Sequence, residues 1–169
     1  MRLCPWADVV YGCDGPWWKN NNGLPKFSGL KLSNDQYVCT AYRDLHKVYV
    51  QTEDRMLFDE PAVIGTGGNS GFQAINLACQ FGATRILLIG FDMHGANGVH
   101  WYGLNNPNNM NNPGEVNFVR WRNALNSQSG ILAAMGVDVV NTSPSSALVC
   151  FRQQSIDKTL GEWGYANAA

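Results

Sequence analysis

The chain has 169 residues and a net charge of −1, with 45% hydrophobic and 15% charged residues. This length and composition predict one globular domain with a hydrophobic core and exclude an intrinsically disordered chain. Because no basic run is present, the charge pattern does not fit a dedicated nucleic-acid-binding protein.

Targeting signals and cysteine content indicate the compartment of the protein. No apolar stretch is long enough to span a bilayer, and residues 1–6 do not form a signal peptide. The five cysteines are scattered without a C-x-x-C pair, which predicts reduced thiols and no structural metal. We therefore expect a cytoplasmic protein, in the host cytoplasm if a phage encodes it.

Short β-branched or apolar runs at 7–11, 47–51, 85–90 and 137–141 predict strands. The run at 85–90 is the strongest, and its unbroken apolar character is typical of a buried parallel strand. We expect residues 86–90 to form a central strand. Residues 14–23 and 95–114 fit no regular element and are expected to be loops.

Two helices are predicted between the strands. In the helix at 70–81, Gln73, Asn76 and Gln80 form a narrow polar stripe, and nearly every other residue is apolar. In the helix at 115–135, apolar residues recur at three- and four-residue steps, as in Phe118, Trp121 and Leu125. This alternation predicts residues 1–169 to be a single-domain α/β protein, Rossmann-like and three-layered, with a mainly parallel sheet.

The segment Gly65-Thr-Gly-Gly-Asn-Ser-Gly71 opens the first of these helices. Backbone N–H groups at a helix N-terminus can bind phosphate, so we interpret Gly68, Asn69, Ser70 and Gly71 as nucleotide-binding residues. The segment is neither a Walker A motif, because no lysine follows, nor a G-x-G-x-x-G motif. The alternative is a tight turn with ordinary helix capping.

Asp92 follows the strongest strand directly. Ligands of open α/β sheets bind outside the carboxyl ends of the strands, so Asp92 is a candidate catalytic residue. It could accept a hydrogen bond from a ribose hydroxyl, bind a metal or take a proton from an acceptor. The alternative is a cap for the following turn.

The loop at 95–114 is long and contains seven asparagines, and loops of this length tend to be lids or binding loops. His100 lies within it beside Trp101 and Tyr102. Because histidine titrates near neutral pH, His100 is the candidate general base, the alternative being an ordinary loop histidine. We expect four residues to bind the acceptor or form the lid: Asp14, Trp17, Trp101 and Tyr102.

Three motifs in order resemble the small bacterial CMP-sialic-acid sialyltransferases and their phage and archaeal relatives, which include hydroxymethylpterin pyrophosphokinase-like proteins. They are the helix start Ser70-Gly71, the strand ending at Gly90-Phe91-Asp92, and the segment 139–148 with its Pro-Ser-Ser turn. The resemblance implies a nucleotide pocket between the first and last of these motifs. It adds four nucleotide-binding candidates: Asn141, Ser143, Ser145 and Ser146.

The chain departs from that family in two respects. Relatives begin with a βα unit whose loop holds the nucleotide, and no such segment precedes Met1, so we expect a truncated or reduced member. Relatives also place a catalytic histidine just before the helix that corresponds to 115–135. Residues 111–114 are Asn-Asn-Pro-Gly here, which makes His100 a substitute.

Three functions follow from these observations. The first is metal-independent glycosyl transfer from a nucleotide sugar, favoured because no Asp-x-Asp pair is present to hold a metal on a diphosphate, and it requires no cofactor. The second is Mg²⁺-dependent pyrophosphoryl or nucleotidyl transfer with Asp14 and Asp92 as ligands. The third is a non-catalytic nucleotide-binding phage accessory protein. For each of these functions the protein could also form a homo-oligomer.

Overall fold

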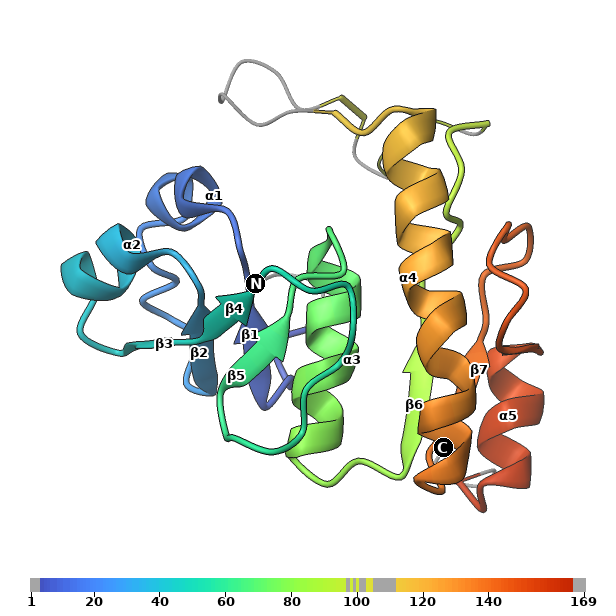
Figure 1. The fold of residues 1–169 in the computed structure, drawn as a ribbon. Helices are drawn as coiled ribbons and strands as arrows, with labels where there is room; N and C mark the ends of the chain where they lie inside the picture. Colours follow the sequence, from blue (N-terminus) through green and yellow to red (C-terminus); the bar gives the residue numbers. More distant parts are fainter. Residues whose placement is uncertain (1–3, 97, 99, 101–102, 105–111, 166–169) are drawn as a thin grey trace.

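The protein has an α/β fold, seen in a computed structural model that describes residues 4–96, 98, 100, 103–104 and 112–165 (Figure 1). All strand pairs in the described residues are parallel, which confirms the predicted class. The strands form three small sheets, in the orders β1-β2-β3, β4-β5 and β6-β7-β8, rather than one Rossmann sheet.

The elements follow one another as alternating strands and helices along most of the chain. In order they are β1 (Val9–Tyr11), α1 (Gly15–Asn20), β2 (Leu30–Ser33), α2 (Gln36–Ala41), β3 (Leu45–Lys47), β4 (Tyr49–Gln51), β5 (Val63–Gly65), α3 (Ser70–Gln80), β6 (Arg85–Leu88), α4 (Glu115–Ala134), β7 (Asp138–Asn141), β8 (Arg152–Gln153) and α5 (Ile156–Glu162).

The first two sheets are joined through the segment 45–51, which carries β3 and β4. The Val48 N–H donates to the Ser33 carbonyl, and the Tyr49 N–H donates to the Ala62 carbonyl. Since successive N–H groups of a strand point to opposite edges, β2 and β5 lie on opposite sides of this segment. The sheet order therefore continues from β1 through β2 and β3–β4 to β5.

Helices cover both faces of these first two sheets. Val10 of β1 packs with Trp18 of α1 and Val38 of α2 on one face. The next residue, Tyr11, points to the other face and packs in a cluster with Leu77 of α3. Because side chains alternate along a strand, this arrangement gives three layers around β1–β5.

Helix α3 lies between these sheets and the β6-β7-β8 sheet (Figure 1). Its residues Phe72 and Ile75 belong to the largest hydrophobic cluster, with Leu88 of β6 and Leu125 of α4. Packing on two sides explains why so much of its sequence is apolar. The predicted boundaries of α3 and α4 are confirmed to within one residue.

Two details of the predicted architecture are wrong. Within the described residues β6 hydrogen-bonds to β7 alone, so it lies at the edge of its sheet and not at the centre. The segment 14–23 is not a simple loop, because it contains α1, with Asp14 at the N-cap and Pro16 in the first turn, where proline is well tolerated.

Two of the three residues in the polar stripe of α3 are buried, and Gln80 is half-buried. Gln73 and Asn76 are 4% and 0% exposed. Asn76 makes three hydrogen bonds and Gln80 makes four with the backbone of residues 57–65. The stripe therefore anchors the irregular segment that leads into β5 and satisfies its buried backbone groups.

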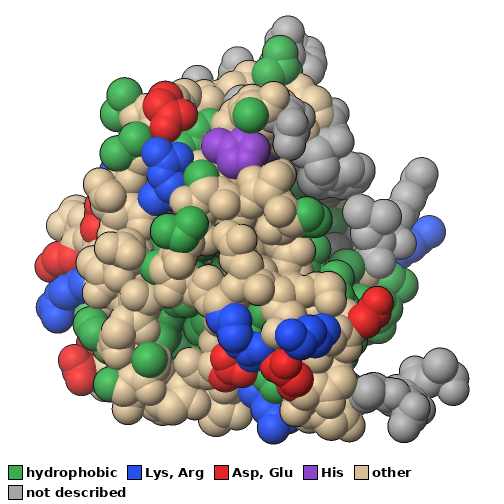
Figure 2. All heavy atoms as spheres, turned by 90° about the vertical axis from the view of Figure 1, so that its right-hand side faces the viewer, with side chains coloured by type: hydrophobic (Ala, Val, Ile, Leu, Met, Phe, Trp, Pro, Cys, Tyr) green, Lys and Arg blue, Asp and Glu red, His purple; other side chains and the backbone are tan. Residues whose placement is uncertain are grey.

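The amino ends of β7 and β8 carry a network of exposed charges. Arg152 pairs with both Asp138 and Glu162, joining β7, β8 and α5. Figure 2 shows basic and acidic side chains gathered at one end of this face and a histidine toward the other end.

In the described residues, no helix is long and apolar enough to cross a membrane.

Candidate functional site

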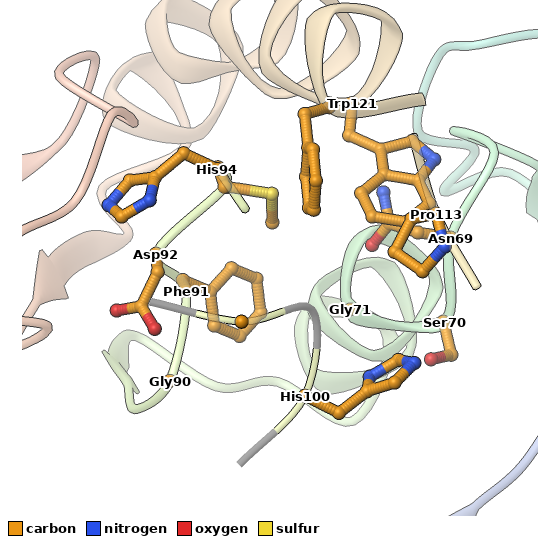
Figure 3. A pocket seen from close by; sticks show the side chains of 13 residues that line it. Asn69, Ser70, Gly71, Gly90, Phe91, Asp92, His94, His100, Pro113 and Trp121 are labelled. Atoms are coloured by element: carbon orange, nitrogen blue, oxygen red, sulfur yellow. The ribbon is translucent and has the colours of Figure 1, made fainter. Parts of the chain in front are cut away.

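A cavity of about 370 Å³ lies where the chain leaves β5 and β6 at their carboxyl ends and enters α3 (Figure 3). Its volume falls in the range of small-molecule sites. It is lined by Asn69, Ser70, Gly71, Gly90, Phe91, Asp92, Met93, His94, Gly98, His100, Pro113, Phe118 and Trp121. Five of the predicted site residues, Asn69, Ser70, Gly71, Asp92 and His100, therefore line one cavity.

The first turn of α3 contributes hydrogen-bond donors to this cavity. Asn69 caps the helix, because its Oδ1 accepts from the Phe72 N–H at 2.8 Å. The backbone N–H groups of Ser70 and Gly71 have no acceptor within the described part of the chain. Together with the helix dipole, such donors attract an anion.

Two aromatic rings pack against the first turn of α3 and the loop that precedes it. A Cβ atom on Gly71 would lie 2.8 Å from the ring of Phe91, and one on Gly68 would lie 3.2 Å from Cδ1 of Trp121. The Trp121 Nε1–H donates to the Gly68 carbonyl at 2.7 Å. Gly68 does not line the cavity, but it holds Trp121 in place.

The turn that carries Asp92 has a strained backbone. Gly90 has φ +75°, which glycine adopts without strain, and Met93 has φ +56°, which a residue with a side chain rarely adopts. Strain of this kind persists only where the surroundings fix it, and it is frequent at functional sites.

Hydrogen bonds from two other segments fix this turn. The Phe91 N–H donates to Ser143 Oγ at 2.7 Å, and Ser146 Oγ donates to the Phe91 carbonyl at 2.5 Å. Arg122 Nη1 donates to the Met93 carbonyl at 2.6 Å. These contacts hold the side of the cavity on which Asp92 lies.

The segment 141–146 therefore lies behind the turn at 90–94, and none of Asn141, Ser143, Ser145 and Ser146 lines the cavity. Asn141 is fully buried and accepts from the Ser143 N–H. The loops at 67–71, 92–101 and 141–146 were expected to meet. The first two contribute residues to the cavity, whereas the third hydrogen-bonds to the turn at 90–94. Nucleotide binding by these four residues stays a prediction.

The two histidines of the cavity lie on different sides of it (Figure 3). The Nδ1 atom of His94 accepts from the Ala96 N–H, so its Nε2 carries the proton that faces the Ser145 carbonyl 2.5 Å away. In Figure 3, His100 and Ser70 lie toward one side of the cavity, and Asp92 and His94 lie toward the other. Trp101 and Tyr102, expected in the lid, lie outside the described residues.

The end of β1 reaches the start of α3, a contact that the sequence did not predict. Burial and the neighbouring Asp14 carboxylate raise the pKa of the Cys13 thiol to about 12, and a hydrogen bond with the Ser70 hydroxyl opposes this shift. Asp14 is exposed and Trp17 is half-buried, and neither lines the cavity. Their predicted role with the acceptor stays a prediction.

Phe118 and Trp121 were predicted only as part of the apolar stripe of a helix. Their i, i+3 spacing is that of core residues, and no sequence signal separates a cavity wall from a core. The described residues contain no cluster of three His, Cys, Asp or Glu side chains that could hold a metal.

No known protein family, curated protein or solved structure matches the chain. The resemblance to the small bacterial sialyltransferases therefore stays a prediction from the three motifs.

Proposed function

We propose that the chain binds a nucleotide sugar in this cavity and transfers its glycosyl group without a metal. The observation that supports the proposal is the meeting of three kinds of group in one cavity. They are the N–H groups of Ser70 and Gly71, which have no acceptor among the described residues, the Asp92 carboxylate and the His100 imidazole.

Each group has a part in this reaction. The phosphate lies at the start of α3, where the dipole contributes roughly 0.3–1 kcal/mol and the Ser70 hydroxyl adds a donor. His100 takes the proton of the acceptor hydroxyl, whose oxygen forms the new glycosidic bond. The bond between the sugar and the phosphate oxygen breaks, and the nucleotide leaves with the electron pair, stabilised by the same N–H groups. Asp92 accepts a hydrogen bond from a sugar hydroxyl.

All five cysteines are free thiols. This state supports a reducing compartment, and we place the protein in the cytoplasm, or in the host cytoplasm if a phage encodes it.

The test measures the melting temperature with CMP, UDP, GDP and ADP and their sugar conjugates, with and without Mg²⁺. We expect one nucleotide series to raise the melting temperature equally with and without Mg²⁺. The sugar conjugate of that series should be turned over. Ser70→Ala should reduce the shift, and Ser129→Ala on α4 is the matched control. Gly71→Ala is a poorer variant, because its Cβ would displace Phe91.

Other outcomes would replace the proposal. A shift that requires Mg²⁺ would favour pyrophosphoryl or nucleotidyl transfer, and binding without turnover would favour a nucleotide-binding accessory protein. No shift with any compound would refute nucleotide binding.

A further inference from the structure

Two aromatic side chains form a wall of the cavity. Phe118 and Trp121 lie one helical turn apart on α4, and both line the cavity. Their rings meet edge to face, with centroids 5.4 Å apart and planes at 86°. This is a preferred geometry for aromatic pairs, and it holds each ring in one orientation.

The polar edge of the Trp121 indole is already occupied. Its only donor, Nε1–H, is used by the Gly68 carbonyl at 2.7 Å. What the indole offers to a ligand is therefore its apolar, π-electron surface. A flat aromatic ring is the chemical group that gains most from such a surface, because it stacks without needing a hydrogen bond.

We propose that the Phe118–Trp121 wall is the subsite for the nucleobase of the ligand. The inference rests on the proposed function, in which the phosphate lies at Ser70 and Gly71. Figure 3 places Trp121 near Asn69, across the cavity from Gly90. The ligand would then run from the start of α3 toward α4, with its sugar directed to Asp92 and His100.

Trp121 also connects the two ends of the ligand. Through the Gly68 carbonyl it holds the loop that leads to Ser70, so a change at Trp121 can act on the phosphate as well as on the base. The test must separate these effects. The ratio of nucleotide affinity to ribose 5-phosphate affinity separates them. A disturbed loop weakens the binding of every phosphate-bearing ligand, whereas a lost stacking surface weakens the binding only of ligands with a base.

The experiment determines the dissociation constants of ribose 5-phosphate and of CMP, UMP, AMP and GMP by calorimetry. The measured quantity is the affinity of the tightest nucleotide relative to ribose 5-phosphate. Trp121→Met should lower this ratio at least about fivefold, the lower end of measured base-stacking effects. Trp121→Phe keeps an aromatic ring but loses the hydrogen bond to Gly68. It should therefore lower the affinity for ribose 5-phosphate and for the nucleotide equally and leave their ratio unchanged.

Trp163→Phe is the matched control. The Trp163 indole also donates its Nε1–H, to Asp138 Oδ2 at 2.8 Å, but at the amino ends of the strands. It should leave both dissociation constants unchanged. If Trp121→Met does not fold, the tryptophan fluorescence of the unmutated protein should still be quenched by the nucleotide, and this quenching should be absent in Trp121→Phe.

Two results overturn the subsite while leaving the proposed function in place. One is an unchanged ratio in Trp121→Met, and the other is equal affinity of the unmutated protein for ribose 5-phosphate and every nucleotide. Failure of the unmutated protein to bind any of the five probes overturns nucleotide binding, and the subsite with it.

Discussion

Tyr11 donates its hydroxyl proton to Oε1 of Gln73 at 2.8 Å, which joins β1 to α3 across 62 positions of the chain. Burial raises the pKa of this hydroxyl, so it stays a donor throughout the physiological range. The neighbouring contact between Cys13 and Ser70 lies beside the cavity. The first strand therefore helps to hold the segment at which we place the phosphate.

Stability should fall at alkaline pH because of two thiols. Burial raises the pKa of Cys13 to about 12 and that of Cys150 to about 11. In the unfolded chain both thiols ionise near pH 8.5, so above that pH the unfolded state binds fewer protons than the folded state. Their contribution is complete below that pH and is lost as the pH rises toward 11 and 12. We expect the urea midpoint to fall between pH 8.5 and 11.

Cys13→Ala should flatten this dependence, and Ser127→Ala, which removes no titrating group, should keep the original slope. A steeper slope in Cys13→Ala would contradict the assignment.

Asn76 should be essential for stability. Replacing it with leucine leaves the N–H groups of Leu57 and Gly65 without their acceptor. We expect a loss of about 3 kcal/mol in the free energy of unfolding, measured by urea denaturation. Asn126→Leu, at an exposed position of α4, should change it by less than about 0.5 kcal/mol. Equal effects of the two variants would show that the stripe of α3 is not an anchor.

Ser146 and Ser70 should differ in how they affect the cavity. Ser146→Ala removes the donor to the Phe91 carbonyl and the acceptor of the Leu148 N–H, so stability should fall by about 1–3 kcal/mol and nucleotide affinity should fall with it. Ser70 is exposed, so the loss of its hydrogen bond with Cys13 should change stability little, whereas Ser70→Ala should lower affinity. Thermal melting and calorimetry of the same samples measure both quantities. Unchanged stability in Ser146→Ala would mean that this serine does not brace the turn.

The sequence predicts the α/β class, α3 and α4 because these features depend on local periodicity. It does not predict that β6 is an edge strand, since strand order depends on contacts between distant segments. Short elements such as α1 and β5 lack the length that makes a pattern visible.

The site shows the same division. Ser70, Asp92 and His100 were found from a helix start, a strand end and a loop, and they line one cavity. The polar stripe of α3 could not be assigned from sequence, because Gln73 and Asn76 read equally well as exposed or as buried and paired. Ser143 and Ser146 were interpreted as ligand-binding, and only the fold reveals that they bind the backbone of Phe91.

His100 should be the residue that sets the rate of transfer. Removal of a general base typically costs ~10²–10⁴-fold in turnover, so His100→Ala should lower turnover by that order and barely change nucleotide affinity. His94→Ala should have a much smaller effect on turnover, because its ring nitrogens are engaged with the backbone of Ala96 and Ser145. Equal turnover in the two variants would remove His100 from the mechanism.

The most direct test of the account is an NMR titration of the ¹⁵N-labelled protein with CMP, UDP, GDP and ADP. It follows the backbone amides of Ser70 and Gly71, which have no acceptor in the described residues. We predict that one nucleotide shifts these two amides and that of Phe91 together, at saturating and matched concentrations. A second cavity of about 330 Å³, which Asn22, Lys26 and Phe27 help to line, is the internal comparison. Shifts confined to that second cavity, or none with any nucleotide, would contradict a nucleotide site at the start of α3.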